Sequence, residues 1–242
     1  MSDGIELIPV RGIGEVARGA DLAGLICDAV ELRHRDVVVV TQKVVSKAEG
    51  AMEPVDPGDP LSHKPLVERE SVRIIRRRGD LIISETRHGF VCANAGIDLS
   101  NVERGWAALL PEDPDRSARR IRDGIRGRTG TSVGVIVSDT FGRTWRRGVT
   151  DVAIGSAGLV PVVDLRGSQD AYGRELQVTE VAIVDEIAGA AELVMGKSRG
   201  VPVAIVRGLG DDAFAPVGPL GDEEHRGVLT DVVRSPAEDL FR

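Results

Sequence analysis

The sequence predicts a mixed α/β protein of the α+β kind, in which strands and helices alternate irregularly. Three apolar runs, at 36–42, 134–138 and 201–208, are rich in valine and isoleucine and are typical of buried strands. Between them lie segments whose apolar residues recur at helical spacing. Long loops separate these elements, so we expect a mixed architecture rather than a regular doubly wound sheet.

The first helix is expected over 22–32, where apolar residues recur at helical spacing and Asp21 is a suitable N-cap. The strand at 36–42 follows, and the sequence MEPVDPGDP at 52–60 then indicates a loop. A basic helix is predicted over 65–79. Its inward face would consist of Val67, Val72 and Ile75.

Two short strands are expected at 81–86 and 90–98, joined by a tight turn. The next helix, over 113–130, has Asp113 as its N-cap, a proline in its first turn and a glycine at its end. After the strand at 134–138, a long helix is predicted over 178–196. The last strand follows directly after a short glycine-containing connection.

The composition limits the classes of function. A formal net charge of −7 over 242 residues argues against a nucleic-acid surface, so clustered cations would suit a small anionic ligand. No apolar run could span a membrane and no signal peptide is visible, so we expect a cytoplasmic protein. The isolated Cys27 and Cys92 are interpreted as reduced packing residues. No linker divides residues 1–242, so any second subdomain would arise from an insertion.

The stretch GVIVSDTFGRTWRRGVTDVAIG, at 134–155, combines a buried strand with a cluster of charge. Asp139 and Thr140 end its apolar run, and a carboxylate beside a hydroxyl suits Mg²⁺ or Mn²⁺. Three arginines follow within eight residues: Arg143, Arg146 and Arg147. Guanidinium groups bind phosphate oxygens in forked pairs. A polar strand end with solvated arginines is the alternative, and this segment alone does not decide between the two.

A second polar set lies in CANAGIDLSNV, at 92–102, whose small residues allow a ligand to approach the backbone closely. Asp98, Ser100 and Asn101 place a carboxylate, a hydroxyl and an amide within one turn. The same residue types are common in Asx-type turns, and turn statistics alone favour that structural role.

Weaker signals point to phosphate binding. Lys43 and Lys47 lie four residues apart after a buried strand, and GKSRG at 196–200 places two cations among glycines. A solvated helix start explains the two lysines equally well, and a glycine C-cap with a flanking lysine explains the second segment. RGIGEVARG at 11–19 lacks the G-x-G-x-x-G spacing, and no P-loop sequence occurs. No Ser-His-Asp or Cys-His arrangement is visible, which favours metal-assisted phosphoryl or acyl chemistry.

Taken together, these stretches resemble the coenzyme F420-0:L-glutamate ligase family, the γ-glutamyl ligases of the deazaflavin cofactor. The motifs occur in the order IPVRGIGEV, DVVVVTQKVVSKAEG, CANAGIDLSNV, GVIVSDTFGRTWRRGVTDVAIG, DAYGRELQVTEVAIVDEIAGAAELVMGK and VPVAIVRG. They cover most of residues 5–208. The resemblance implies a two-domain γ-glutamyl ligase fold that forms an intertwined homodimer.

It also implies an enzyme of coenzyme F420 biosynthesis that adds L-glutamate to F420-0 and then a γ-linked glutamate to F420-1. GTP would be the co-substrate, GDP a product and an acyl phosphate the intermediate. Two ions of Mn²⁺ or Mg²⁺, together with K⁺, would be the cofactors. Longer relatives continue into a nitroreductase-like domain. We expect no such domain and no reductase activity in residues 1–242, whether the chain is a stand-alone ligase or one truncated before that domain.

By position, the resemblance also assigns site residues. Asp98 and Asp139 would be metal ligands, with Thr140 beside the second ion. The nucleotide would be contacted by Ile13, Gly14, Glu15, Val16, Gln42, Lys47, Asn101, Gly196 and Lys197. Gln42 departs from the Ser or Thr that the family often has there. We expect Arg146 to be catalytic together with the two aspartates, and the neighbouring arginines to bind phosphate or the incoming glutamate.

Two other classes of function stay open. A metal-dependent phosphohydrolase with Asp139 as nucleophile lacks the usual Asp-x-Asp pattern, because Val137 and Phe141 stand at the neighbouring alternate positions. A non-catalytic nucleotide-binding module is the other. The sequence does not determine the number of glutamates added, the choice between Mn²⁺ and Mg²⁺, or the preference for GTP over ATP.

Overall fold

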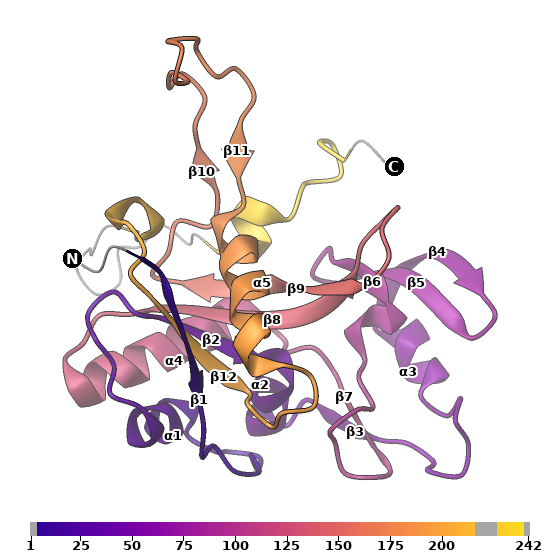
Figure 1. Cartoon of the computed structure of the whole chain (residues 1–242). Coiled ribbons are helices and arrows are strands. Elements are labelled where there is room, and N and C mark those ends of the chain that lie inside the picture. The colour runs from indigo at the N-terminus through magenta and orange to yellow at the C-terminus, as the bar shows by residue number, and fades with distance from the viewer. Residues whose placement is uncertain (1–3, 216–226, 240–242) are drawn as a thin grey trace.

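The computed structural model describes residues 4–215 and 227–239 of the chain. A five-stranded sheet forms its centre, with the strand order β1-β12-β2-β8-β9 (Figure 1). The strands span Glu6–Val10 (β1), Val203–Arg207 (β12), Val37–Thr41 (β2), Gly134–Gly142 (β8) and Val149–Ala157 (β9). In this sheet β2 and β8 run parallel, whereas the other neighbouring pairs are antiparallel. The predicted mixed α/β class is therefore confirmed.

The central strands form where β-branched residues are buried on both faces of the sheet. Val37 to Val40 of β2 and Val135 to Val137 of β8 have no exposed surface. Helix α5 (Ile183–Met195) packs on β9, β12 and β1, and Figure 1 shows it crossing the sheet. Helix α4 (Pro114–Thr129) packs on β8 and β9, and α1 (Leu22–Ala29) packs on α4. These helices and strands enclose one large apolar core.

The predicted caps determine where α1 and α4 begin. Asp21 Oδ1 accepts the N–H of Gly24 (3.0 Å), and Asp113 Oδ1 accepts the N–H of Arg116 (2.8 Å). Helix α1 ends three residues earlier than its apolar spacing predicts. The long helix predicted over 178–196 begins only at Ile183. Its first residues instead form β11 (Glu180–Val181), because they pair with β10 (Val163–Asp164).

The prediction of one basic helix over 65–79 is wrong. Helix α3 covers Lys64–Arg69, and Ser71–Arg78 form the strand β4. Val72 and Ile75, predicted to face inward, are exposed, with Val72 at 70%. The β-branched residues of this stretch favour an extended backbone, and β5 (Leu81–Thr86) offers a hydrogen-bonding partner that a sequence pattern does not reveal.

The segment between α2 (Gln42–Glu49) and α4 has its own small apolar cluster. It contains the strands β3 (Met52–Pro54), β5, β6 (Val91–Ala93) and β7 (Trp106–Ala108), so a strand lies within the loop predicted over 52–60. Its buried apolar residues are Val67, Ile82, Ala95, Ile97 and Ala107. The division into two domains and the homodimer stay predictions. Within the described residues, no helix combines the length and the apolar character needed to cross a bilayer.

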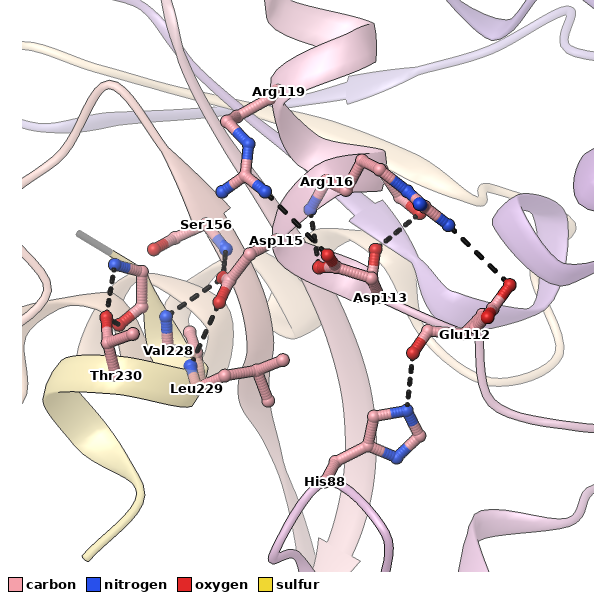
Figure 2. A network of polar contacts seen from close by, with 12 residues as sticks. His88, Glu112, Asp113, Asp115, Arg116, Arg119, Ser156, Val228, Leu229 and Thr230 are labelled. Carbon is pink, nitrogen blue, oxygen red and sulfur yellow. Dashed lines mark hydrogen bonds and ion pairs between the residues drawn. The ribbon is translucent and has the colours of Figure 1, made fainter. Parts of the chain in front are cut away.

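Asp115, in the first turn of α4, holds the C-terminal segment against the sheet (Figure 2). Its carboxylate is 4% exposed and accepts the N–H groups of Ser156 (2.8 Å), Val228 (2.9 Å) and Leu229 (3.0 Å). Burial raises the pKa of Asp115, and the three N–H groups oppose that rise. A Cβ atom at Gly227 would lie 2.4 Å from the Asp115 carboxyl carbon, so only glycine fits there. One side chain thus joins α4, β9 and the helical turn at Val228–Val232.

The substitution Asp115→Ala is expected to lower the free energy of unfolding by about 3 kcal/mol, because three backbone N–H groups lose their buried acceptor. Urea denaturation followed by circular dichroism measures the change. Asp123→Ala removes an exposed carboxylate from the same helix and is expected to change stability by less than about 0.5 kcal/mol. Equal effects of the two substitutions would contradict the anchoring role.

Candidate active-site cleft

A cleft of about 950 Å³ gathers most of the residues that the sequence singled out. Twelve of the thirteen predicted site residues line it: Ile13, Gly14, Glu15, Val16, Gln42, Lys47, Asp98, Asn101, Asp139, Thr140, Gly196 and Lys197. They come from five segments that are distant in the sequence. The exception is Arg146, which lies in the exposed turn between β8 and β9 and does not line the cleft.

The parallel pairing of β2 with β8 brings two of these segments together. Thr41 at the end of β2 pairs with Ser138, so the residues that follow these two emerge at the same edge of the parallel pair. Helix α2 (Gln42–Glu49) begins directly after β2 and carries Lys43 and Lys47 to that edge. The prediction that Asp139 ends its strand is wrong. Strand β8 continues past Ser138 to Gly142, so Asp139 lies within the strand.

A left-handed turn delivers Asp98 to the cleft. Asn94, Ala95 and Gly96 have φ angles of 50°, 53° and 72°, which reverse the chain after β6. The backbone of Asp98 then pairs with Ala108, donating at 3.0 Å and accepting at 2.9 Å. This pairing fixes the backbone from which the carboxylate of Asp98 projects.

The carboxylate of Asp98 has both a structural partner and a charged one. Its Oδ1 accepts the N–H of Ser100 (2.7 Å), which forms the Asx-type turn considered from the sequence. Its Oδ2 pairs with Lys43 Nζ at 2.8 Å. Burial opposes ionisation, but Lys43 and Ser100 together hold the pKa of Asp98 below its ordinary value. Asp98 is therefore ionised in the cleft at neutral pH.

Asp139 has the most strongly shifted carboxyl group facing the cleft. Burial raises its pKa to about 7, and the carboxylates of Asp98 and Asp151 add to the rise. The N–H of Thr140 (2.8 Å) and the charge of Lys197 act in the opposite direction. Acids from separate segments therefore lie close enough to repel one another, which a bound cation would relieve.

Asp151 is a site residue that the sequence did not assign. It is 3% exposed, and its two oxygens accept the hydroxyl groups of Thr140 (2.5 Å) and Ser138 (3.1 Å) across the β8–β9 pair. The hydroxyl of Thr140 is thereby oriented, with its proton toward Asp151. Thr140 and Asp151 are register partners, so recognition of the hairpin in the sequence would have revealed this pair.

Glu192, in the last turns of α5, is a second unassigned acid of the cleft. Burial raises its pKa, and the Asp151 carboxylate contributes to the rise. The sequence signal was weak, because an acid on a predicted helix is ordinary. Glu192 precedes Gly196 by four residues, about one helical turn, so it lies on the side of α5 that faces the loop at 196–202.

Cations and amides connect the other segments of the cleft. Lys47 pairs with Glu15 of the loop after β1, and Asn101 donates to the backbone oxygen of Lys197 (3.3 Å). Gln42 is buried, and its side-chain nitrogen donates to Ser46 Oγ (2.7 Å) and to the Leu109 oxygen (2.6 Å). That nitrogen is therefore engaged within the protein, and the nucleotide contact expected of Gln42 stays a prediction.

The acids of the cleft fit a Mg²⁺ or Mn²⁺ ion that is also bound by substrate. Among the described residues, no group of three or more His, Cys, Asp or Glu side chains is arranged to hold a metal ion by itself. Mg²⁺, however, is commonly bound by one or two carboxylates together with substrate phosphates and water. Asp98, Asp139 and the oriented hydroxyl of Thr140 match that donor set.

Comparison with known proteins gives consistent matches over nearly the whole chain. The family model described as F420-0:Gamma-glutamyl ligase matches residues 12–208. The chain is 44% identical to "Coenzyme F420:L-glutamate ligase" of Methanopyrus kandleri, over 98% of this chain and 97% of the relative. It is 44% identical to the protein of that name from Methanothermobacter thermautotrophicus, over 99% of both. The corresponding Methanocaldococcus jannaschii protein is 39% identical, over 86% of this chain and 84% of the relative.

The substitution Asp139→Asn is expected to stabilise the protein in a chelating buffer at pH 8 but not at pH 4. The folded-state pKa of Asp139 is about 7, above the ordinary value of 3.8, so the wild type loses stability as the pH rises through that interval. The difference between the two proteins changes by at most about 1.4 kcal/mol per pH unit. Denaturant titrations at several pH values measure it, and a pH-independent difference would contradict the assigned pKa.

Proposed function

Because this chain belongs to the F420-0:gamma-glutamyl ligase family, we propose that it is a GTP-dependent ligase that joins L-glutamate to coenzyme F420-0. The observation that supports this most directly is the cleft where the carboxylate of Asp98 adds to the rise in the pKa of Asp139. We further propose that F420-1 accepts a second, γ-linked glutamate in the same cleft. We also propose that the enzyme acts in coenzyme F420 biosynthesis, forms a homodimer and is cytoplasmic.

The cations of the cleft suit the triphosphate of GTP. Lys43, Lys47 and Lys197 enter from α2 and from the loop after α5, and an ammonium group acts as a point charge on phosphate oxygens. The glycines at 14 and 196 leave the backbone accessible along the same wall. We therefore propose that the nucleotide lies between the 13–16 loop, α2 and the 196–202 loop.

Asp98, Asp139 and Thr140 would hold the divalent cations, with Glu192 as a further oxygen donor. When bound, such ions would neutralise phosphate charge and align the phosphoryl group with its acceptor. Asp151 keeps the Thr140 hydroxyl turned with its lone pairs away from Asp151. The Asp98–Lys43 pair would rearrange as the cation and the phosphates enter, because both compete for the same carboxylate. The K⁺ requirement is proposed from the family resemblance alone.

The reaction would proceed in two displacements. The carboxylate of F420-0 attacks the γ-phosphorus of GTP, the bond to the bridging oxygen breaks, and GDP leaves with that electron pair. The amine of glutamate then attacks the acyl carbon, inorganic phosphate leaves, and the nitrogen loses a proton as the amide forms. In this scheme the protein contributes positioning and charge neutralisation, for which the lysines and acids of the cleft are suited.

With purified protein, Mn²⁺, K⁺ and GTP, we expect GDP formation only when F420-0 and L-glutamate are both present. Mass spectrometry is expected to show F420-0 extended by one or more glutamyl residues. Asp139→Ala is expected to lower kcat by about 100-fold or more, whereas the exposed control Asp123→Ala retains wild-type activity. Phosphate release without glutamate would instead indicate a phosphohydrolase, and nucleotide binding without turnover would indicate a binding module.

Removal of divalent metal with a chelator is expected to abolish activity, and added Mn²⁺ to restore it. Asp98→Asn is expected to raise the Kd of Mn²⁺, measured calorimetrically with a non-hydrolysable GTP analogue present, by about tenfold or more. The conservative change keeps the shape of the side chain while removing its charge. Unchanged Mn²⁺ affinity would exclude Asp98 as a metal ligand.

A further inference from the structure

The turn between β8 and β9, at 143–148, presents an unusual group of side chains to solvent. Trp145 is 92% exposed, and Arg143, Arg146 and Arg147 are exposed beside it. In the part of the chain that the structure describes, none of these three arginines forms an ion pair with a carboxylate, although the chain carries a net charge of −7. Three guanidinium groups and an indole therefore face solvent, and within the described residues no carboxylate balances the charge of the arginines.

Hydrogen bonds define the shape of this turn. The N–H of Arg146 donates to the Arg143 oxygen (3.3 Å), and Arg143 Nη2 donates to the Arg147 oxygen (2.9 Å). Trp145 has a φ angle of 66°, which is unfavourable for a residue with a bulky side chain. A strained backbone that presents a large aromatic ring to water is uncommon in a turn that serves only to connect two strands.

The turn is attached to the strand that supplies the cleft. Asp139 and Thr140 line the cleft, and the next residue, Phe141, contacts the Phe90 ring edge-on, with centroids 6.0 Å apart. In Figure 1 the end of the β8–β9 hairpin lies close to β6, and its tip stands clear of the other elements. Trp145 follows Thr140 by five residues, so its Cα lies at most about 18 Å from that of Thr140.

We propose that Trp145 and the surrounding arginines bind the acceptor substrate, a planar fused-ring aromatic that carries phosphate and carboxylate groups. This inference rests on the proposed function. The ring would stack on the indole, and the arginines would bind the phosphodiester, while the reacting carboxylate extends toward Asp139. The sequence left open whether the arginines bind phosphate or glutamate, and the exposed tryptophan favours a large aromatic ligand over glutamate.

A nucleotide is also an aromatic anion, but other parts of the cleft suit it better. The loop at 13–16, Lys47 and the loop at 196–202 lie on elements other than the β8–β9 hairpin. F420-0 also needs two separated contacts, because its ring system and its reacting carboxylate are at opposite ends of the molecule. The hairpin offers one contact at each end: the cation that Asp139 of β8 would hold, and the indole in the turn.

The test uses the full chain and measures the Kd of F420-0 with Mn²⁺ and a non-hydrolysable GTP analogue present, by the fluorescence of the bound ring or by calorimetry. Trp145→Ala is expected to raise the Kd of F420-0 roughly tenfold, the loss typical of one stacking contact. Trp145→Phe is expected to recover most of the affinity. The Kd of the GTP analogue is expected to stay unchanged in both variants.

The matched control is Tyr172→Ala, which removes a 91% exposed aromatic residue from the separate β10–β11 arm. It is expected to leave the Kd of F420-0 unchanged. Arg146→Ala is expected to raise the KM of F420-0 several-fold, to weaken its dependence on salt, and to leave the KM values of GTP and glutamate near those of the wild type. Arg146→Lys is expected to retain part of the affinity because the positive charge is kept.

Three results would overturn the proposal. In the first, Trp145→Ala binds F420-0 as tightly as the wild type does. In the second, Trp145→Ala loses affinity for the GTP analogue and not for F420-0, and in the third it loses both affinities and light scattering shows an altered oligomeric state. The second would assign the turn to the nucleotide, and the third to an interface between copies of the chain. Failure of the wild type to bind F420-0 at all would refute the proposed function, and the inference with it. That outcome differs from equal binding by wild type and variant, which refutes the inference alone.

Discussion

The parallel pairing of β2 with β8 is the constraint on which the site depends. Both strands are completely buried at their centres, and such burial fixes their register because a slip by one residue would exchange the packed faces. With that register fixed, the strands open at a common edge, where α2 supplies two lysines and β8 supplies Asp139 and Thr140. The cleft is thus a consequence of how the core packs.

Opposing charges then shape the cleft. The ionised Asp98 is held by Lys43, whereas Asp139, Asp151 and Glu192 are buried or half-buried acids, and none of the three forms an ion pair within the described residues. Such groups destabilise one another unless positive charge or protons enter. A triphosphate with its cations would supply positive charge to these acids and negative charge to the lysines. The repulsion between the acids that lowers the stability of the free protein would therefore favour ligand binding.

Packing and hydrogen bonds support the elements that carry these charged groups. The insertion between α2 and α4 carries Asp98 on a left-handed turn backed by its own apolar cluster, and Phe90 of that segment contacts Phe141 of β8. Asp115 joins α4, β9 and the C-terminal turn on another side of the sheet. The β8–β9 hairpin extends from these supports, which explains how an exposed turn can present a ligand-binding group in a defined direction.

Local sequence alone determined the central valine-rich strands, the helices capped by Asp21 and Asp113, and the family, because each depends on neighbouring residues or on motifs in order. Tertiary structure decided whether 71–78 is helix or strand, because the pairing with β5 lies outside any local pattern. It also decided that Asp139 lies inside a strand opposite Val152, that Asp151 orients Thr140, and that Arg146 stays outside the cleft. These outcomes depend on which segments meet across the sheet, and contacts between distant segments are set by the packing of the whole chain.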